Sequence, residues 1–324
     1  MDRPSAVAAL RAAVAGFATD CLPGASSWCV ALSGGPDSLA LTAAAAAALP
    51  TTALIVDHGL QAGSAEVAET ARRQAHDLGC VDAQVLRVAV GTGGGPEAAA
   101  RAARYAALDA ARGQAPVLLA HTLDDQAETV LLGLGRGSGA RSIAGMRAAD
   151  PPWYRPLLGV RRAVTHDACA ELGLASWDDP HNHDARFTRV RLRTEVLPLL
   201  EDVLGGGVAE ALARTAAALR EDTEALDDWA ETVLENTTDT GDPAEIIAVA
   251  ALTRLPTAVR RRVIRRWLLR GGAANLSDKQ IRAVDALVTA WHGQGGVAVG
   301  SDLRQQRLFA GRRDGRLTLY TQPV

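Results

Sequence analysis

The chain has 324 residues, of which 48% are hydrophobic and 22% charged, proportions typical of a soluble globular enzyme with one large domain or two of ordinary size. Only one of its 34 basic residues is a lysine, Lys279, which stands in the sequence Ser277-Asp278-Lys279-Gln280. This context argues against a Walker-type phosphate loop, which needs Lys beside Ser or Thr, and against the Schiff-base lysine of a pyridoxal enzyme.

The net charge of -3 results from cancellation between segments of opposite sign. Residues 1–194 hold 18 basic and 19 acidic side chains, residues 195–250 hold 2 and 14, and residues 251–324 hold 14 and 4. A basic segment on an acidic protein is typical of a polyanionic partner.

The cysteines and the apolar runs indicate the compartment. No C-x-x-C pair occurs among Cys21, Cys29, Cys80 and Cys169, so neither a zinc site nor a disulfide framework is expected. The most apolar run, 39–49, is too short to span a bilayer of about 30 Å, and the N-terminus lacks the pattern of a signal peptide. We therefore expect a cytoplasmic protein with no membrane contact.

The first half of the chain alternates predicted strands and helices. Strands are expected at 28–32, 53–56, 84–90 and 116–120, and helices at 39–49, 64–78, 97–112 and 124–134. This rhythm predicts parallel βαβ units and hence an α/β fold with a doubly wound, Rossmann-like parallel sheet. Ligands of such sheets bind at the carboxyl ends of the strands.

The rhythm stops after Asp150. The prolines at 151, 152 and 156 predict an irregular loop, and helices are expected over 160–172 and 208–234. The alternating segment 297–320 predicts one or two short strands. We expect a catalytic domain over 1–210 and a mostly helical domain with the basic segment over 211–324.

The first strand runs into Ser33-Gly34-Gly35-Pro36-Asp37-Ser38, and a helix follows at once. The two glycines allow backbone N–H groups to turn toward a phosphate, the two serines add hydroxyl donors, and the helix N-terminus adds a favourable dipole. Phosphate would repel Asp37 unless a divalent cation bridges them, which implies Mg²⁺. A simple Gly-Pro turn with a Ser/Asp cap is the alternative, and the strand–loop–helix context favours the phosphate site.

A second cluster of charge follows the fourth predicted strand. Asp125 and Glu128 are three residues apart and so share one face of a helix. Two such carboxylates could hold Mg²⁺ or an ammonium group, or they could simply complement the dipole of the helix N-terminus.

The hexapeptide 33–38 resembles the SGGxDS loop of the PP-loop ATP-pyrophosphatase superfamily. Within that superfamily, further segments resemble the tRNA(Ile)-lysidine synthases: VDHGL at 56–60, the E-x-x-A-R-x-x-R-Y pattern at 97–105, AHTLDDQAET at 120–129, DPHN at 179–182 and RVRLR at 189–193. The resemblance covers about residues 28–200 and matches a short form of the family without its extra C-terminal domain. Thr122, Val190 and His181 depart from the family pattern.

The resemblance implies an ATP-dependent ligase with Mg²⁺. It would join free L-lysine to carbon 2 of the first-anticodon cytidine of a tRNA(Ile) with a CAU anticodon, through an adenylated cytidine, releasing AMP and pyrophosphate. The implied nucleotide-binding residues are Ser33, Gly34, Gly35, Asp37, Ser38, Asp57, His58, Arg101 and His121. The implied catalytic residues are Asp37, which also binds the metal, Arg104, which with Arg101 contacts phosphates or the lysine carboxylate, and Asp125 and Glu128, which bind lysine.

Several alternatives stay open from the sequence. The clusters 260–262 and 265–266 predict a helix that offers Arg to tRNA phosphates, or one whose charges pair with the acidic stretch 195–250. His58 could be a structural residue, and a homodimer is compatible with the sequence. A tRNA thiolase would resemble C-x-x-C proteins with an iron–sulfur cluster, and a non-catalytic nucleotide-binding module would need neither the acidic pair nor the Arg-rich segment.

Overall fold

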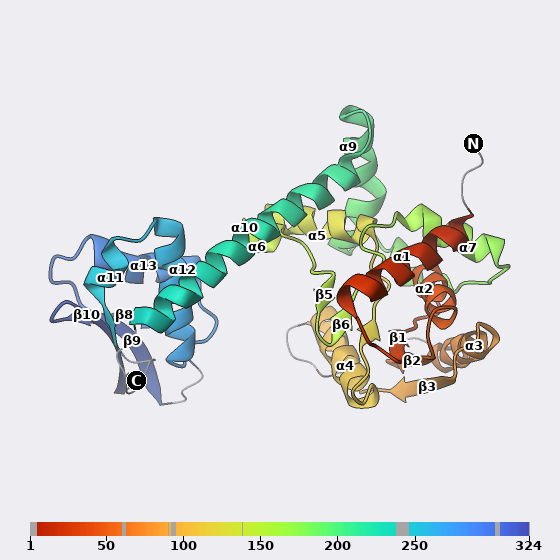
Figure 1. Ribbon diagram of the computed structural model, residues 1–324, viewed down its shortest axis with the longest axis horizontal. Coiled ribbons are helices and arrows are strands. Elements are labelled where there is room, and N and C mark those ends of the chain that lie inside the picture. The colour runs from red at the N-terminus through yellow and green to blue at the C-terminus, as the bar shows by residue number, and fades with distance from the viewer. Residues whose placement is uncertain are drawn as a thin grey trace. The chain divides into compact units, whose positions relative to one another are not determined.

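The computed structural model describes residues 5–59, 63–89, 91, 95–137, 139–237, 246–301 and 305–323. The chain forms two compact units, Met1–Ala218 and Leu219–Val324 (Figure 1). The division between them lies inside helix α10 (Val208–Thr237), as does residue 210, where the sequence places the domain boundary.

A six-stranded sheet in the order β3-β2-β1-β4-β6-β5 organises the first unit. Its strands are β1 (Trp28–Ala31), β2 (Thr51–Asp57), β3 (Asp82–Arg87), β4 (Val117–Leu118), β5 (Ala149–Asp150) and β6 (Trp153–Tyr154). Neighbouring strands pair in parallel except β5, which is antiparallel to β6. The predicted doubly wound, mostly parallel sheet is therefore confirmed.

Helices cover both faces of this sheet because successive residues of a strand point to opposite faces. Val30 belongs to a core shared with helices on one face, whereas Cys29 packs in a second core with Leu108 on the other. The first face is covered by α1 (Ala6–Cys21), α2 (Pro36–Ala46), α3 (Ser64–Asp77) and α7 (Arg162–Glu171), and the second by α4 (Pro96–Ala111) (Figure 1).

The strand order creates a switch point beside β1. The chain winds outward from β1 to β2 and β3, then crosses back through α4 to β4 on the other side of β1. The loop after β1 and the start of α5 (Leu123–Arg136), which follows β4, therefore lie at neighbouring strand ends. Crevices at such points are the usual ligand sites of open α/β sheets.

The prediction of an irregular loop over 151–156 is wrong in one respect. The chain there forms a hairpin whose strands, β5 and β6, extend the sheet beyond β4. Each strand has only two residues, too few to give the alternation from which strands are recognised. The short helix α6 (Ala140–Ile143) lies before the hairpin. Four short elements lead from α7 to α10: η1 (Pro180–His183), α8 (Thr188–Arg191), η2 (Leu192–Val196) and α9 (Leu197–Val203).

The second unit packs helices on a small antiparallel sheet in the order β7-β10-β9-β8. Its elements after α10 are β7 (Ile246–Ala248), α11 (Val249–Thr253), α12 (Thr257–Arg270), α13 (Asp278–Thr289), β8 (Val297–Val299), β9 (Gln306–Arg313) and β10 (Arg316–Pro323). Segment 297–320 thus contains three strands rather than one or two. Among the described helices, none is both long and apolar enough to cross a membrane.

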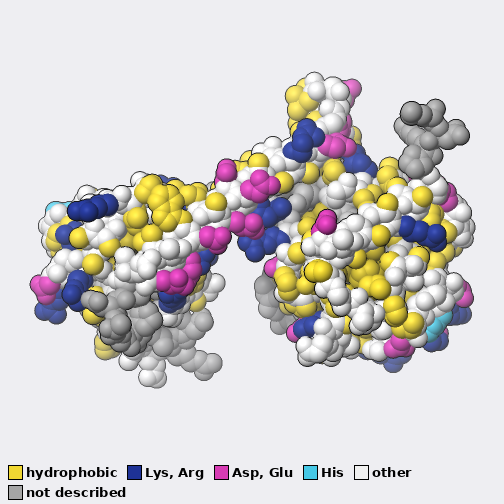
Figure 2. Space-filling model, in the orientation of Figure 1, with side chains coloured by type: hydrophobic (Ala, Val, Ile, Leu, Met, Phe, Trp, Pro, Cys, Tyr) yellow, Lys and Arg dark blue, Asp and Glu magenta, His cyan; other side chains and the backbone are white. Residues whose placement is uncertain are grey.

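The arginines of α12 are neutralised within this unit. Arg260 is buried and its Nε lies 2.5 Å from Asp285 Oδ1, while Arg261 reaches the other oxygen of Asp285 at 2.9 Å. Arg262 pairs with Asp227 of α10 at 2.9 Å, and Glu231 of α10 pairs with both Arg266 and Arg270. Figure 2 shows acidic side chains gathered along α10. The charges of α12 are therefore largely paired with carboxylates of α10 and α13.

Candidate active site

The loop after β1 is shaped by hydrogen bonds of its own serines. Ser38 Oγ accepts a hydrogen bond from Ser33 N at 3.1 Å and donates one to Gly35 O at 2.9 Å. Gly34 has a φ of 83°, in the left-handed region that favours glycine. Pro36 is the first residue of α2, whose first turn leaves backbone N–H groups without acceptors inside the helix. The loop and the helix start together form a ready anion site.

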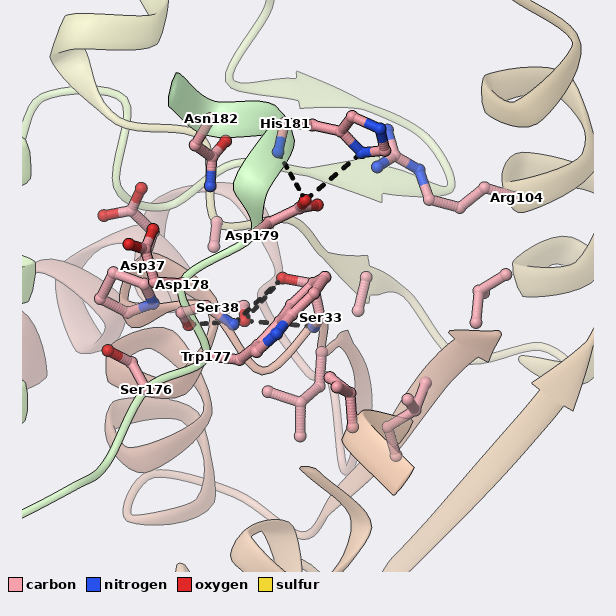
Figure 3. A pocket seen from close by; sticks show the side chains of 18 of the residues that line it. Ser33, Asp37, Ser38, Arg104, Ser176, Trp177, Asp178, Asp179, His181 and Asn182 are labelled. Atoms are coloured by element: carbon pink, nitrogen blue, oxygen red, sulfur yellow. Dashed lines mark hydrogen bonds and ion pairs between the residues drawn. The ribbon is translucent and has the colours of Figure 1, made fainter. Parts of the chain in front are cut away.

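A cleft of about 880 Å³ opens beside this loop at the switch point (Figure 3). Nine of the predicted site residues line it: Ser33, Gly35, Asp37, Ser38, Asp57, His58, Arg104, His121 and Asp125. Gly34 lines a neighbouring cavity of about 500 Å³, and neither Arg101 nor Glu128 lines either cavity. The structure therefore brings most of the predicted residues to one cleft.

The segment 176–183 forms one wall of the cleft. Trp177 N donates a hydrogen bond to Gly34 O at 2.9 Å, which ties this segment directly to the phosphate loop. Two histidines of this segment each lie beside an aspartate: His181 Nδ1 is 3.3 Å from Asp179 and His183 Nε2 is 2.9 Å from Asp178.

Burial disfavours the charged form of two histidines of the cleft. Burial lowers the pKa of His121 to about 4, and nearby arginines oppose its charge further. Burial and the charge of Arg104 lower the pKa of His58 as well. In the described part of the chain, the Nδ1 atoms of both rings are buried without a hydrogen-bond partner. Buried polar atoms are normally satisfied, so these two nitrogens suit a polar ligand in the cleft.

Arg104 and Asp57 line the same cleft. Burial and the charge of Arg101 lower the pKa of Arg104, while Arg101 itself donates a hydrogen bond to Tyr105 Oη at 3.1 Å. The backbone N–H of Gly59 donates to Asp57 at 3.0 Å, and together with Ser64 it holds the pKa of Asp57 below its usual range. Asp57 therefore shapes the turn that presents His58, and Arg104 offers a cation to an anionic ligand.

Asp37 faces the cleft from the first turn of α2 and contacts α7. Its carboxylate accepts a hydrogen bond from Thr165 Oγ1 and lies 3.4 Å from Arg162 Nε. Burial raises the pKa of Asp37, and these two partners oppose the rise. No group of three or more metal-ligating side chains gathers among the residues that the structure describes. A Mg²⁺ at Asp37 would therefore take its other ligands from phosphate and water, which is how the ion is commonly held beside nucleotides.

Asp125 meets the same arginine from the other side. Its Oδ1 lies 2.6 Å from an Arg162 terminal nitrogen, and its Oδ2 accepts hydrogen bonds from Thr122 N at 2.8 Å and Thr122 Oγ1 at 2.9 Å. Burial opposes ionisation, but Arg162 and the Thr122 donors hold the pKa of Asp125 below its usual range. Thr122, which departs from the family pattern, thus caps α5 and fixes the carboxylate.

Glu128 lies one turn deeper and is fully buried. Its oxygens pair with Arg193 Nε at 2.8 Å, with Arg162 at 3.3 Å and with Arg189 at 3.9 Å. Glu128 does not line the cleft itself but holds in place Arg162 and Arg193, which do. The sequence did not single out Arg162 or Arg193 as site residues. Arg193 belongs to the RVRLR segment that resembles the family pattern. Nothing in the sequence around Arg162 indicates that it lies between Asp37 and Asp125, each more than 35 residues away in the chain.

Comparisons with known proteins agree with this geometry. Residues 9–200 match the PP-loop domain family, and residues 248–318 match the family described as the TilS substrate binding domain. The chain resembles the U34-tRNA thiolase NcsA from Methanococcus maripaludis with a TM-score of 0.54 at 16% identity, covering 67% of this chain and 80% of that one, which shows a shared fold.

Three relatives that match nearly the full length of the chain are all tRNA(Ile)-lysidine synthases. The tRNA(Ile)-lysidine synthase of Mycobacterium bovis is 71% identical over 324 residues, which are 100% of both chains. Those of Mycobacterium leprae and Nocardia farcinica are 68% and 62% identical, covering 100% of both chains in the first case and 97% of this chain and 98% of the relative in the second. By its sequence and its PP-loop domain, the chain belongs to the tRNA(Ile)-lysidine synthase family.

Proposed function

We propose that this enzyme joins L-lysine to carbon 2 of the first-anticodon cytidine of a tRNA(Ile) with a CAU anticodon, cleaving ATP to AMP and pyrophosphate in the cytoplasm. One observation carries the proposal beyond the family. The phosphate loop and the acidic residue Asp125 line one cleft, so a nucleotide and a cationic substrate can meet there.

In the first step, the carbon-2 oxygen of cytidine attacks the α-phosphorus of ATP, and the bond to the β-phosphate oxygen breaks to release pyrophosphate. Ser33, Ser38 and the backbone N–H groups of the loop hydrogen-bond the phosphates, and Arg104 stabilises the charge that develops on them. Mg²⁺ held by Asp37 would supply further neutralisation of the phosphates. The target base has to leave the anticodon stack to reach this cleft.

In the second step, the bound ε-ammonium of lysine gives one proton to water, the resulting neutral amine attacks carbon 2, AMP leaves with the oxygen, and a second proton passes from the nitrogen to water. Asp125 receives the substrate as an ammonium ion and positions its nitrogen, because the residue lines the cleft and its Oδ2 is held by Thr122. Glu128, buried behind it, acts through the arginines that it holds.

Pyrophosphate release with ATP, lysine and unmodified tRNA tests this function. Asp37→Asn should lower turnover about 100-fold or more, because the variant loses the charge that anchors the metal at the phosphates. Asp109→Asn is the matched control, since Asp109 is exposed on α4 and pairs only with Arg112 among the ion pairs seen there. Full lysidine formation by the Asp37 variant would contradict the assignment of the loop.

The same assay separates two other functions. A non-catalytic nucleotide-binding module would bind ATP and release no pyrophosphate. A thiolase would release pyrophosphate without consuming lysine, and the four cysteines, which are free thiols with Cys29, Cys80 and Cys169 buried, do not favour a cluster-bearing site.

A further inference from the structure

One guanidinium connects the two halves of the active site. Through different nitrogens, Arg162 lies 3.4 Å from Asp37, 2.6 Å from Asp125 and 3.3 Å from Glu128. Its backbone N–H also donates to Asp124 at 2.7 Å, which fixes the start of α7 against α5. Burial opposes its charge, but Asp125, Glu128 and Asp37 hold the pKa of Arg162 above its ordinary value.

The three carboxylates do not depend on Arg162 equally. Glu128 keeps Arg193 at 2.8 Å as a second partner, whereas Arg193 is 3.5 Å from Asp125. No other arginine contact to Asp37 occurs among the ion pairs of the described residues. If Arg162 moved away, Glu128 would keep Arg193 at 2.8 Å, whereas Asp125 would keep only the longer Arg193 contact at 3.5 Å and its Thr122 donors. Asp37 would lose its arginine partner among the described residues.

In the proposed function, these two carboxylates bind the cations that arrive with the substrates. Asp37 would face Mg²⁺ at the phosphates and Asp125 the ammonium of lysine. Arg162 lines the same cleft as Ser33 and Ser38, so phosphate oxygens at the loop would attract its guanidinium. The guanidinium of arginine matches the geometry of both carboxylate and phosphate, so Arg162 can exchange one kind of partner for the other.

We propose that Arg162 is an exchangeable counter-cation. It neutralises Asp37 and Asp125 before ATP binds, then moves to the phosphates of bound ATP and leaves Asp125 free for the ammonium group of the second substrate. Binding of ATP and of the amine is then positively coupled through one side chain, and the coupling is reciprocal. This inference rests on the proposed function and adds an order to it.

Calorimetric titration of lysine, with and without Mg²⁺ and an ATP analogue that cannot be cleaved between the α and β phosphates, tests the coupling without turnover. In the wild type, the analogue should tighten lysine binding by about 10-fold, within the usual range for coupled sites. Arg162→Gln should bind lysine tightly without the analogue, and the analogue should then change the affinity less than about 2-fold.

Arg161→Gln is the matched control. Arg161 precedes Arg162 and pairs with Asp124, Glu201 and Glu210, and it does not line the cleft. It should keep the coupling of the wild type. If Arg162→Gln does not fold by circular dichroism, Arg162→Lys takes its place, because lysine has one nitrogen and cannot give a different nitrogen to Asp37 and to Asp125 as the guanidinium does; it should also lose most of the coupling.

The outcomes separate this inference from the function beneath it. Asp125→Asn should abolish lysine binding if the proposed site is right. Lysine binding that needs Asp125, with coupling that is absent in the wild type or unchanged in the Arg162 variants, would overturn the counter-cation alone. Lysine binding that is absent in the wild type or indifferent to Asp125→Asn would overturn both.

Discussion

Replacing Arg260 by methionine tests whether this arginine stabilises the fold or contacts tRNA. Arg260 begins the run of three arginines that the sequence offers as a candidate for tRNA phosphates, yet it is 7% exposed and its partner Asp285 is 4% exposed. We expect Arg260→Met to weaken the folding of the second unit and to leave the tRNA affinity of the folded enzyme unchanged.

The magnitude follows from the contacts that would be lost. Arg260 donates to Asp285 at 2.5 Å and to Leu255 O at 2.9 Å. Removing one partner of a buried ion pair costs about 3–5 kcal/mol, because the other charge stays buried. Arg261 still reaches Asp285 at 2.9 Å, so we expect a loss in free energy of unfolding of about 3 kcal/mol, at the lower end of that range. For a unit of about 100 residues this lowers Tm by about 10 °C or more.

Thermal denaturation and tRNA binding over a series of salt concentrations measure the two effects separately. Arg282→Met is the control, because Arg282 pairs with Asp278 at an exposed site and should change stability by less than about 1 kcal/mol. Adding Asp285→Leu to Arg260→Met should recover most of the loss, since an apolar pair of similar size suits a buried position. An unchanged Tm together with weaker tRNA binding and a shallower salt dependence would refute the structural role of Arg260.

Two further predictions concern the first unit. The pKa of His121 falls from 6.5 in the unfolded chain to about 4 in the folded one, so the unfolded state binds more protons and stability falls as the pH drops from 6.5 to about 4. His121→Gln should flatten Tm against pH in that window, and an unaltered pH dependence would contradict the burial of a neutral ring. A Cβ at Gly133 would lie 2.1 Å from Ser142 O, so Gly133→Ala should lower stability by about 2 kcal/mol or more in denaturant unfolding. Gly135→Ala, on the same helix with open space around it, should instead be neutral or stabilising by up to about 1 kcal/mol, and equal losses in both variants would point to helix α5 in general.

The elements that position the site were predictable because their signals are local. The buried strand at 28–31, the glycines at 34 and 35 and the helix start at Pro36 are adjacent in the chain, so one short segment specifies the phosphate loop. The long helix α10 was also predictable, since its amphipathic pattern persists from Val208 to Thr237. Strands β5 and β6 were not, because two residues each carry no period.

Pairing between distant residues accounts for what the sequence could not show. The sequence presents Arg260, Arg261 and Arg262 as one basic cluster with two possible uses, and the partners that decide between them are Asp285 and Asp227. These lie 25 residues later and 35 residues earlier in the chain, on other helices. Charge counts along the sequence therefore locate a basic segment but not the fraction of it that faces solvent.

The same limit applies to the active site and explains the role of arginine there. Asp37, Asp125 and Arg162 come from three separate helices, so only the folded sheet brings both carboxylates within 3.4 Å of Arg162. A lysine at position 162 would carry the same charge but could offer a single nitrogen, whereas the guanidinium gives a different nitrogen to each carboxylate. Because only one of the 34 basic residues is a lysine, nearly all cationic side chains of this chain are guanidinium groups with several nitrogens. The compact ammonium at Asp125 can then come from the substrate, and the phosphates of ATP are the group that can draw the guanidinium away.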